Sequence, residues 1–249
     1  MIAALVACIV GFAVFLSLAV FVAGNNSLQR SGTVTNGKRV KYSAVSYSDT
    51  VRYNSSGDST VTKTPPSSDS AFVRVTDYAP RIRVDLRYAG KRNFTGKQIY
   101  AFQDAYLRYG TVKKLIKAQE KLEKYGMGLE IWDAFRPVEA QYQLWEVCPN
   151  PLYVSDPTQG YSSHACGNAV DVTLVDSDGI EMLMPTGFDN FTKLADRDYS
   201  DIDDDFAKDN VHLLEKVMKE SGFTLYAEEW WHFTDTDEYD VDETFVPGS

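Results

Sequence analysis

The stretch that most constrains this chain is Ser162–Asp171, which contains one of only three histidines in the sequence. His164 is followed by a Gly-Asn pair and then by a run rich in β-branched residues. This pattern predicts a loop, a turn and then a strand. His164 would lie in the loop and Asp171 early in the strand. An imidazole and a carboxylate held in this way are either two ligands of a Zn²⁺ ion or polar groups of a turn that hydrogen-bond to each other.

A further candidate ligand lies near the C-terminus, in the aromatic segment Glu228–Phe233. His232 supplies a second imidazole, and Glu229 is a candidate general base three positions before it. A catalytic zinc keeps three protein ligands and one position for water, so His164, Asp171 and His232 would suffice. Residues i and i+3 of a regular strand face opposite sides, so we expect a bend or a strand end before His232. The alternative is that this segment is core and that His232 is a buried, hydrogen-bonded histidine.

The remainder of the globular part mixes helical and strand patterns. Apolar residues at helical spacing predict helices, and short alternating or β-branched runs between turn residues predict strands. The third histidine, His212, flanks the apolar stripe of a predicted helix and is expected to pack or face solvent. The pattern as a whole predicts an α+β domain with a small, mainly antiparallel sheet flanked by helices. Helices are expected over 111–125, 138–145 and 210–221, and strands over 72–86, 127–132, 170–175, 180–184 and 223–226.

Five segments resemble, in order, those of the zinc D,D-peptidase family, which contains D-Ala-D-Ala dipeptidases of the vancomycin-resistance type and D,D-carboxypeptidases. Two of them are the Ser-x-His-x6-Asp and Glu-x-x-His patterns described above. The other three are Asn93–Gly96, Trp132–Pro137, and Phe188–Asp189 after a Met-Pro pair. The resemblance covers roughly Asp85 to the C-terminus and favours the dipeptidase branch. It implies a zinc site in a central cleft.

The resemblance also implies how such a chain would work. One Zn²⁺ per chain would be bound by His164, Asp171 and His232. The expected reaction is hydrolysis of the D-alanyl-D-alanine dipeptide by metal-activated water, with Glu229 as the general base. Arg136 would stabilise the oxyanion together with the metal, although it could equally form a structural ion pair with Asp133.

Substrate contacts follow from the same resemblance. Asp189 would hold the free amino group of the dipeptide through a charge-assisted hydrogen bond, and Ser162 would help to bind its carboxylate. Tyr88 and Tyr100 match tyrosines near the site in the family, and either residue could instead be packing.

Three other functions stay open at this point. The first is a D,D-carboxypeptidase that trims peptidoglycan stem peptides, which have no free amine for Asp189 to hold. The second is a non-catalytic cell-wall-binding module on the same fold. The third is a cysteine enzyme that uses Cys166 with His164. Cys166 also departs from the basic residue often found at that position in the family.

The N-terminal part has a different composition. Met1–Gly24 is almost wholly apolar, carries no charged side chain and has about the ~20 residues that a membrane span needs. We therefore expect a transmembrane anchor, or a signal peptide that is cleaved. Residues 25–70 are rich in Ser and Thr and are expected to form a flexible tether, and residues 71–249 the catalytic domain. The domain would lie outside the cytoplasm, although the basic residues that follow the apolar segment favour the opposite orientation.

Charge and cysteine content narrow the choice of partners. The 249-residue chain has a formal net charge of −10 and no basic cluster, which argues against nucleic acid as a partner. The expected partners are D-Ala-D-Ala or a peptidoglycan-derived peptide, and the membrane through the N-terminal segment. Cys148 and Cys166 form a disulfide in one interpretation, which requires export, and are free thiols in the other.

Overall fold

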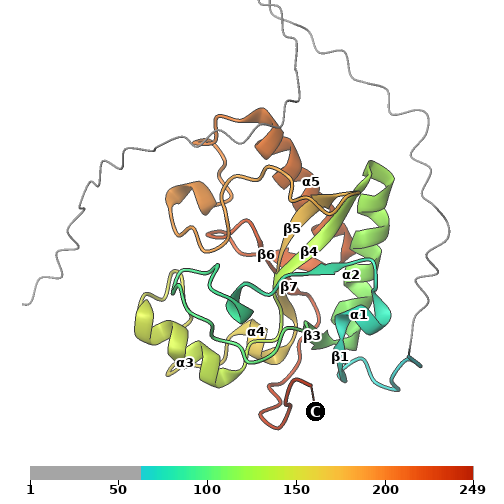
Figure 1. The fold of residues 1–249 in the computed structure, drawn as a ribbon, viewed down its shortest axis with the longest axis vertical. Coiled ribbons are helices and arrows are strands. Elements are labelled where there is room, and N and C mark those ends of the chain that lie inside the picture. Colours follow the sequence, from blue (N-terminus) through green and yellow to red (C-terminus); the bar gives the residue numbers. More distant parts are fainter. Residues whose placement is uncertain (1–62, 249) are drawn as a thin grey trace, which may run out of the picture. The chain divides into compact units, whose positions relative to one another are not determined.

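The computed structural model describes residues 63–248, and Figure 1 shows helices packed around a central sheet. In chain order the elements are β1 (Phe72–Arg74), α1 (Val75–Tyr78), β2 (Arg83–Val84), η1 (Arg87–Ala89), β3 (Tyr106–Arg108), α2 (Tyr109–Leu122), η2 (Glu123–Tyr125), β4 (Met127–Asp133), α3 (Val138–Val147), α4 (Ser163–Cys166), β5 (Ala169–Asp176), η3 (Lys193–Ala195), α5 (Asp205–Ser221), β6 (Phe223–Leu225) and β7 (His232–Asp235).

The larger sheet has five strands in the order β2-β4-β5-β7-β6. The edge strand β2 runs parallel to β4, and the other three pairings are antiparallel. Strands β1 and β3 form a separate antiparallel pair. The α+β class and the mainly antiparallel sheet, both predicted from the sequence, are confirmed.

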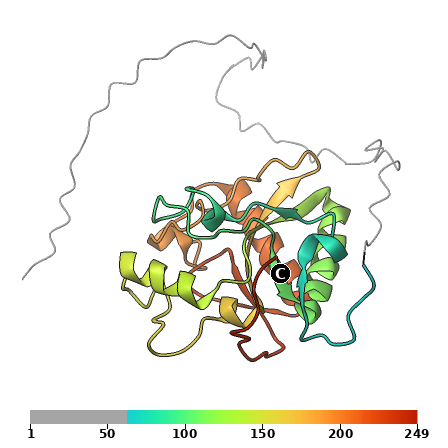
Figure 2. The ribbon, with the colours of Figure 1, turned by 60° about the horizontal axis from the view of Figure 1, so that its bottom comes forward.

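Helices α2 and α5 pack against each other and against strands of the large sheet. Helix α2 lies on the opposite side of the sheet from α3 in both views (Figures 1 and 2). Both faces of β5 are buried, and its first seven residues all lie in the interior. This explains why the strand reads as a nearly continuous apolar run rather than as an alternation.

The long helices begin and end at residues that suit helix termini. The Asp204 carboxylate accepts hydrogen bonds from the N–H groups of Phe206 and Ala207 and caps α5, as an N-cap aspartate should. Gly222 ends α5 and Gly126 ends the α2–η2 segment, both in the left-handed conformation. The predicted start of α5 at residue 210 was therefore wrong, because the capping aspartate lies six residues earlier.

Three other predicted elements differ from the structure. The region 72–86 contains only two short strands with the one-turn helix α1 between them. The predicted return strand over 180–184 is reduced to a single bridge between Val175 and Glu181. His164 lies in the one-turn helix α4 rather than in a loop, because the Ser162 hydroxyl accepts from the His164 N–H and closes the turn.

The predicted anchor over residues 1–24, and most of the predicted tether over 25–70, fall outside the described residues. The described end of the tether contacts the domain: Lys63 pairs with Asp77 at 2.9 Å, and the Tyr78 hydroxyl donates to the Thr64 carbonyl at 3.1 Å. Between residues 63 and 248, no helix is both long enough and apolar enough to cross a membrane. Cys148 and Cys166 are free thiols.

Alanine substitutions at two glycines test the packing around the C-terminal end of α4. Gly167 ends α4 with φ of +76°, and a Cβ there would overlap the Phe72 ring, which is stacked on Phe245 and edge-on to Phe135. Gly126 has φ of +70° but open space around it. Gly126→Ala should cost about 1–2 kcal/mol of unfolding free energy from backbone strain alone. Gly167→Ala should cost clearly more in urea unfolding, because the Phe72 ring must also move; equal losses would contradict this packing argument.

Candidate active site

The register of the large sheet brings three polar residues into one row. Asp133 on β4 is the cross-strand partner of Asp171 on β5, and Asp171 is the partner of His232 on β7. A register shift between Ile131 and Asp133 makes the first pairing possible. Polar side chains in a buried row must satisfy one another or bind a ligand.

Helix α4 adds a fourth side chain to this row. The helix docks on the end of β4, where the Arg136 N–H donates to the His164 carbonyl at 3.2 Å. The His164 Nδ1 lies 2.8 Å from the Ala134 carbonyl oxygen. A carbonyl only accepts hydrogen bonds, so Nδ1 carries the proton and Nε2 presents a lone pair.

Three ligand atoms converge at this point. His164 Nε2 lies 3.1 Å from His232 Nδ1 and 3.4 Å from Asp171 Oδ1, and His232 Nδ1 lies 3.0 Å from Asp171 Oδ1. Ligands bound at ~2.0–2.2 Å around a tetrahedral Zn²⁺ are about 3.3–3.6 Å apart. The observed triangle is close to that size, so these residues fit a metal ion.

The ring nitrogens of His164 and His232 that point away from this triangle also suit metal binding. The Thr234 hydroxyl lies 3.1 Å from His232 Nε2 and can accept its proton, and in that tautomer, the one metal binding requires, the inner Nδ1 is bare. Each histidine then holds its outer N–H on an oxygen and points a lone pair inward, as metal-ligating histidines do. Two lone pairs and a carboxylate repel one another unless a cation lies among them.

The protonation of these groups also suits metal binding. Burial would raise the pKa of Asp171, but the two adjacent histidines hold that pKa well below its ordinary value. Burial lowers the pKa of His232 although Asp171 is close to it. Both residues therefore take the deprotonated form that ligation requires.

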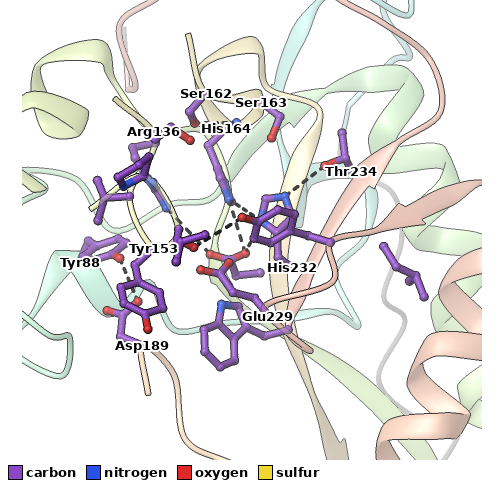
Figure 3. Close-up of a pocket in the computed structure, with 18 residues that line it drawn as sticks. Tyr88, Arg136, Tyr153, Ser162, Ser163, His164, Asp189, Glu229, His232 and Thr234 are labelled. Carbon is purple, nitrogen blue, oxygen red and sulfur yellow. Dashed lines mark hydrogen bonds and ion pairs between the residues drawn. The ribbon is translucent and has the colours of Figure 1, made fainter. Parts of the chain in front are cut away.

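Glu229 lies in the turn between β6 and β7, so the expected strand end before His232 is confirmed. Figure 3 shows its side chain pointing toward His232 and the pocket. Burial, with the negative charges of Asp171 and Asp189, raises the pKa of Glu229 well above its ordinary value. Trp231, which is buried, forms part of the pocket wall beside it.

Arg136 faces the row from the end of β4. Its Nε and Nη2 donate to Asp133 Oδ2 at 3.0 and 2.7 Å, and its Nη1 donates to Gln141 Oε1 at 2.9 Å. Nη2 is also 4.0 Å from Asp171 Oδ2. The structural ion pair with Asp133 is thus present, and it holds the guanidinium at the wall of the pocket.

Asp189 occupies the other side of the pocket (Figure 3). The Tyr88 hydroxyl donates to its Oδ1 at 3.0 Å and the Phe94 N–H to its Oδ2 at 3.1 Å. Its backbone has φ of +57°, a conformation that aspartate adopts at some cost. Burial raises the pKa of Asp189 to about 7, against these two hydrogen bonds.

These residues line one cavity of about 280 Å³, near the lower end of the ~300–1,000 Å³ typical of ligand pockets. Of the nine residues predicted for the site, eight line it, including Ser162 and Tyr88. Tyr100 does not line it; its hydroxyl donates to Asp133 Oδ1 at 2.7 Å from behind. His212 lies on the exposed side of α5, against Tyr199.

Several residues in or behind the pocket wall were not predicted from the sequence. Tyr153 stacks on Phe191 with ring centroids 4.7 Å apart, and Tyr226 packs edge-on against His232. Thr234 and Gln141 act through hydrogen bonds described above. A polar residue two positions after His232, on the same face of the strand, was a usable signal for Thr234; no local pattern marked the others.

Two other candidate sites, an acidic cluster and Cys166, lack the features expected of a metal site or a nucleophile. Asp85, Glu130 and Glu181 also cluster, but the Arg87 guanidinium already pairs with all three. Burial raises the pKa of the Cys166 thiol, whereas a nucleophilic cysteine needs a lowered pKa. Cys166 is also not among the residues that line the cavity, so neither observation favours the cysteine-enzyme interpretation.

The chain is similar to known proteins over most of its described residues. The D-Ala-D-Ala dipeptidase family of M15 peptidases matches residues 68–247. The D-alanyl-D-alanine dipeptidase of Escherichia coli (strain K12) is 37% identical over 167 residues, covering 67% of this chain and 86% of that protein. The chain belongs to this family. The D-alanyl-D-alanine dipeptidase of Streptomyces coelicolor (strain ATCC BAA-471 / A3(2) / M145) is 32% identical over 198 residues, covering 70% and 96%, and that of Enterococcus faecium is 30% identical over 187 residues, covering 67% and 92%.

Membership of the M15 peptidase family makes this protein a metallopeptidase and confirms the family resemblance of its motifs. The binding-module interpretation was therefore wrong. The three converging side chains His164, Asp171 and His232 could hold the metal ion of such a peptidase.

The raised pKa of Asp189 in this M15 peptidase predicts how the stability of the metal-free protein depends on pH. Asp189 has a pKa of about 7 when folded and about 4 when unfolded, so the folded state binds its proton more tightly. Its contribution to stability is present below about pH 4 and is lost as the pH rises toward 7. Asp189→Asn should therefore raise the melting temperature clearly more at pH 8 than at pH 5, in chelator. The control is the exposed Asp178→Asn, and a pH-independent difference at Asp189 would contradict the assignment.

Proposed function

We propose that this M15 peptidase is a zinc-dependent D-Ala-D-Ala dipeptidase. The observation that carries the proposal is the convergence of His164 Nε2, Asp171 Oδ1 and His232 Nδ1 within 3.4 Å of one another in a pocket that also contains Glu229 and Arg136. Relatives that match most of this chain bear the name D-alanyl-D-alanine dipeptidase. Nitrogen and carboxylate ligands in a three-residue set suit Zn²⁺.

Glu229 is the proposed general base and acid. When bound, a divalent zinc ion supplies Lewis-acid polarisation and lowers the pKa of water. Glu229 would accept a proton from the attacking water and deliver it to the nitrogen of the leaving D-alanine. Its raised pKa suits a group that must carry this proton between the two steps.

Arg136 is the proposed stabiliser of the negative charge that develops on the peptide oxygen. Asp133 and Gln141 fix the guanidinium by three hydrogen bonds, so its charge is oriented before the substrate arrives. Preorganised charge of this kind lowers the barrier because nothing has to reorient during the reaction.

Asp189 and Ser162 are the proposed contacts for the two ends of a free dipeptide. A half-protonated carboxyl with only two hydrogen bonds gains a strong partner when an ammonium group binds. The Ser162 hydroxyl accepts from the His164 N–H but keeps its own proton to donate to a carboxylate. We also propose, from the tether and the family resemblance that follow the apolar segment Met1–Gly24, that the catalytic domain lies outside the cytoplasm.

The test of the mechanism is a matched pair of variants in the zinc-loaded protein. Glu229→Gln should lower kcat for D-Ala-D-Ala by about 100- to 10,000-fold, the usual contribution of a general base. The exposed neighbour Glu228 provides the control, and Glu228→Gln should leave kcat unchanged. Full activity of the Glu229 variant would exclude this residue as the base.

The test of the substrate is release of D-alanine from the dipeptide and from a stem pentapeptide, side by side. The proposal predicts chelator-sensitive cleavage of the dipeptide, with KM raised at least tenfold by Asp189→Ala because the substrate amine loses its partner. Cleavage of the pentapeptide alone would move the assignment to a D,D-carboxypeptidase.

A further inference from the structure

Gln141 is a buried residue of α3 that touches both Arg136 and the pocket wall. It is 3% exposed and is not among the residues that line the cavity, so it cannot contact the substrate directly. Its Oε1 accepts from Arg136 Nη1 at 2.9 Å, and its Nε2 donates to the Ser155 carbonyl at 2.7 Å. One side-chain amide therefore joins two parts of the site.

The two partners of Gln141 have different tasks. Arg136 presents its charge beside Asp171. Ser155 ends the segment Pro151–Ser155, which forms one wall of the cavity and includes Tyr153. The segment belongs to an irregular stretch between α3 and α4, and the Asn150 carbonyl accepts the N–H groups of Tyr153 and Val154.

We propose that Gln141 is a positioning residue that sets Arg136 and the wall segment Pro151–Ser155 in one fixed arrangement. The inference rests on the proposed dipeptidase function. Asp133 holds the Nε and Nη2 edge of the guanidinium, and Gln141 holds Nη1. Loss of the second support lets the guanidinium turn about its contact with Asp133. Loss of the bond to Ser155 lets the wall move away from the substrate.

Two substitutions separate these effects. Gln141→Met keeps the length of the side chain but removes both hydrogen bonds, so kcat should fall and KM should rise. The expected loss in kcat/KM is about 10- to 100-fold, the usual cost of losing a hydrogen bond to a charged group. Gln141→Glu retains an acceptor for Arg136 but turns a second acceptor toward the Ser155 carbonyl. Its KM should rise while kcat stays within about threefold of the wild type.

The chain offers a matched control in Gln119. This glutamine of α2 is also buried, at 5% exposed, and its amide also joins two elements: it accepts from the Leu129 N–H at 2.8 Å and donates to Glu123 at 3.1 Å. Gln119→Met should lower the melting temperature and leave kcat and KM unchanged. If Gln141→Met likewise lowered only the melting temperature, Gln141 would be merely structural and the proposal would be wrong.

A second readout is independent of turnover. Hydrogen exchange of the backbone amides between residues 150 and 156 should be faster in Gln141→Met and Gln141→Glu, and unchanged in Gln119→Met. Unchanged exchange in both Gln141 variants would overturn the link to the wall. The zinc-loaded full chain is assayed first on D-Ala-D-Ala. If the wild type is inactive but hydrogen exchange is faster in the Gln141 variants, the proposed function is refuted while the link between Gln141 and the wall segment stands. If the wild type is active and both Gln141 variants have unaltered kinetics, only the inference about Gln141 is refuted.

Discussion

The site depends on the convergence of two imidazole nitrogens and one carboxylate at a single buried point. The sheet register sets Asp171 beside His232, and α4 brings His164 to within 3.4 Å of both. The Ala134 carbonyl fixes which nitrogen of His164 faces inward. Electrostatic repulsion between these groups favours a cation among them, so folding and metal binding should stabilise each other.

The ionisable groups around this point differ in how readily they carry charge. Asp133 holds the Arg136 guanidinium on one side, and Asp189 and Glu229 have raised pKa values because burial and neighbouring carboxylates disfavour their charged forms. Groups with separated pKa values in one cavity suit a reaction that needs a base, a fixed cation and an anchor for an ammonium group. The same arrangement costs stability in the metal-free protein, as is common where function requires buried charge.

Much of this site could be predicted from the sequence because its motifs are local. The spacing of His164 and Asp171 and the Glu-x-x-His segment marked the proposed ligands and the proposed base, although Asp189 was reached only through resemblance. Gln141 could not be predicted, because its partners Arg136 and Ser155 are brought to it by tertiary packing. The fold class followed from periodicity, whereas α4 and β2 are too short to give a periodic signal.

The central claim is tested most directly by diffraction at the zinc absorption edge from crystals of the zinc-loaded protein. The account predicts one strong anomalous peak per chain, ~2.0–2.2 Å from His164 Nε2, His232 Nδ1 and an Asp171 carboxylate oxygen. It also predicts that the peak disappears in His232→Ala. No peak at this point, or a single peak at Asp85, Glu130 and Glu181 instead, would contradict the account.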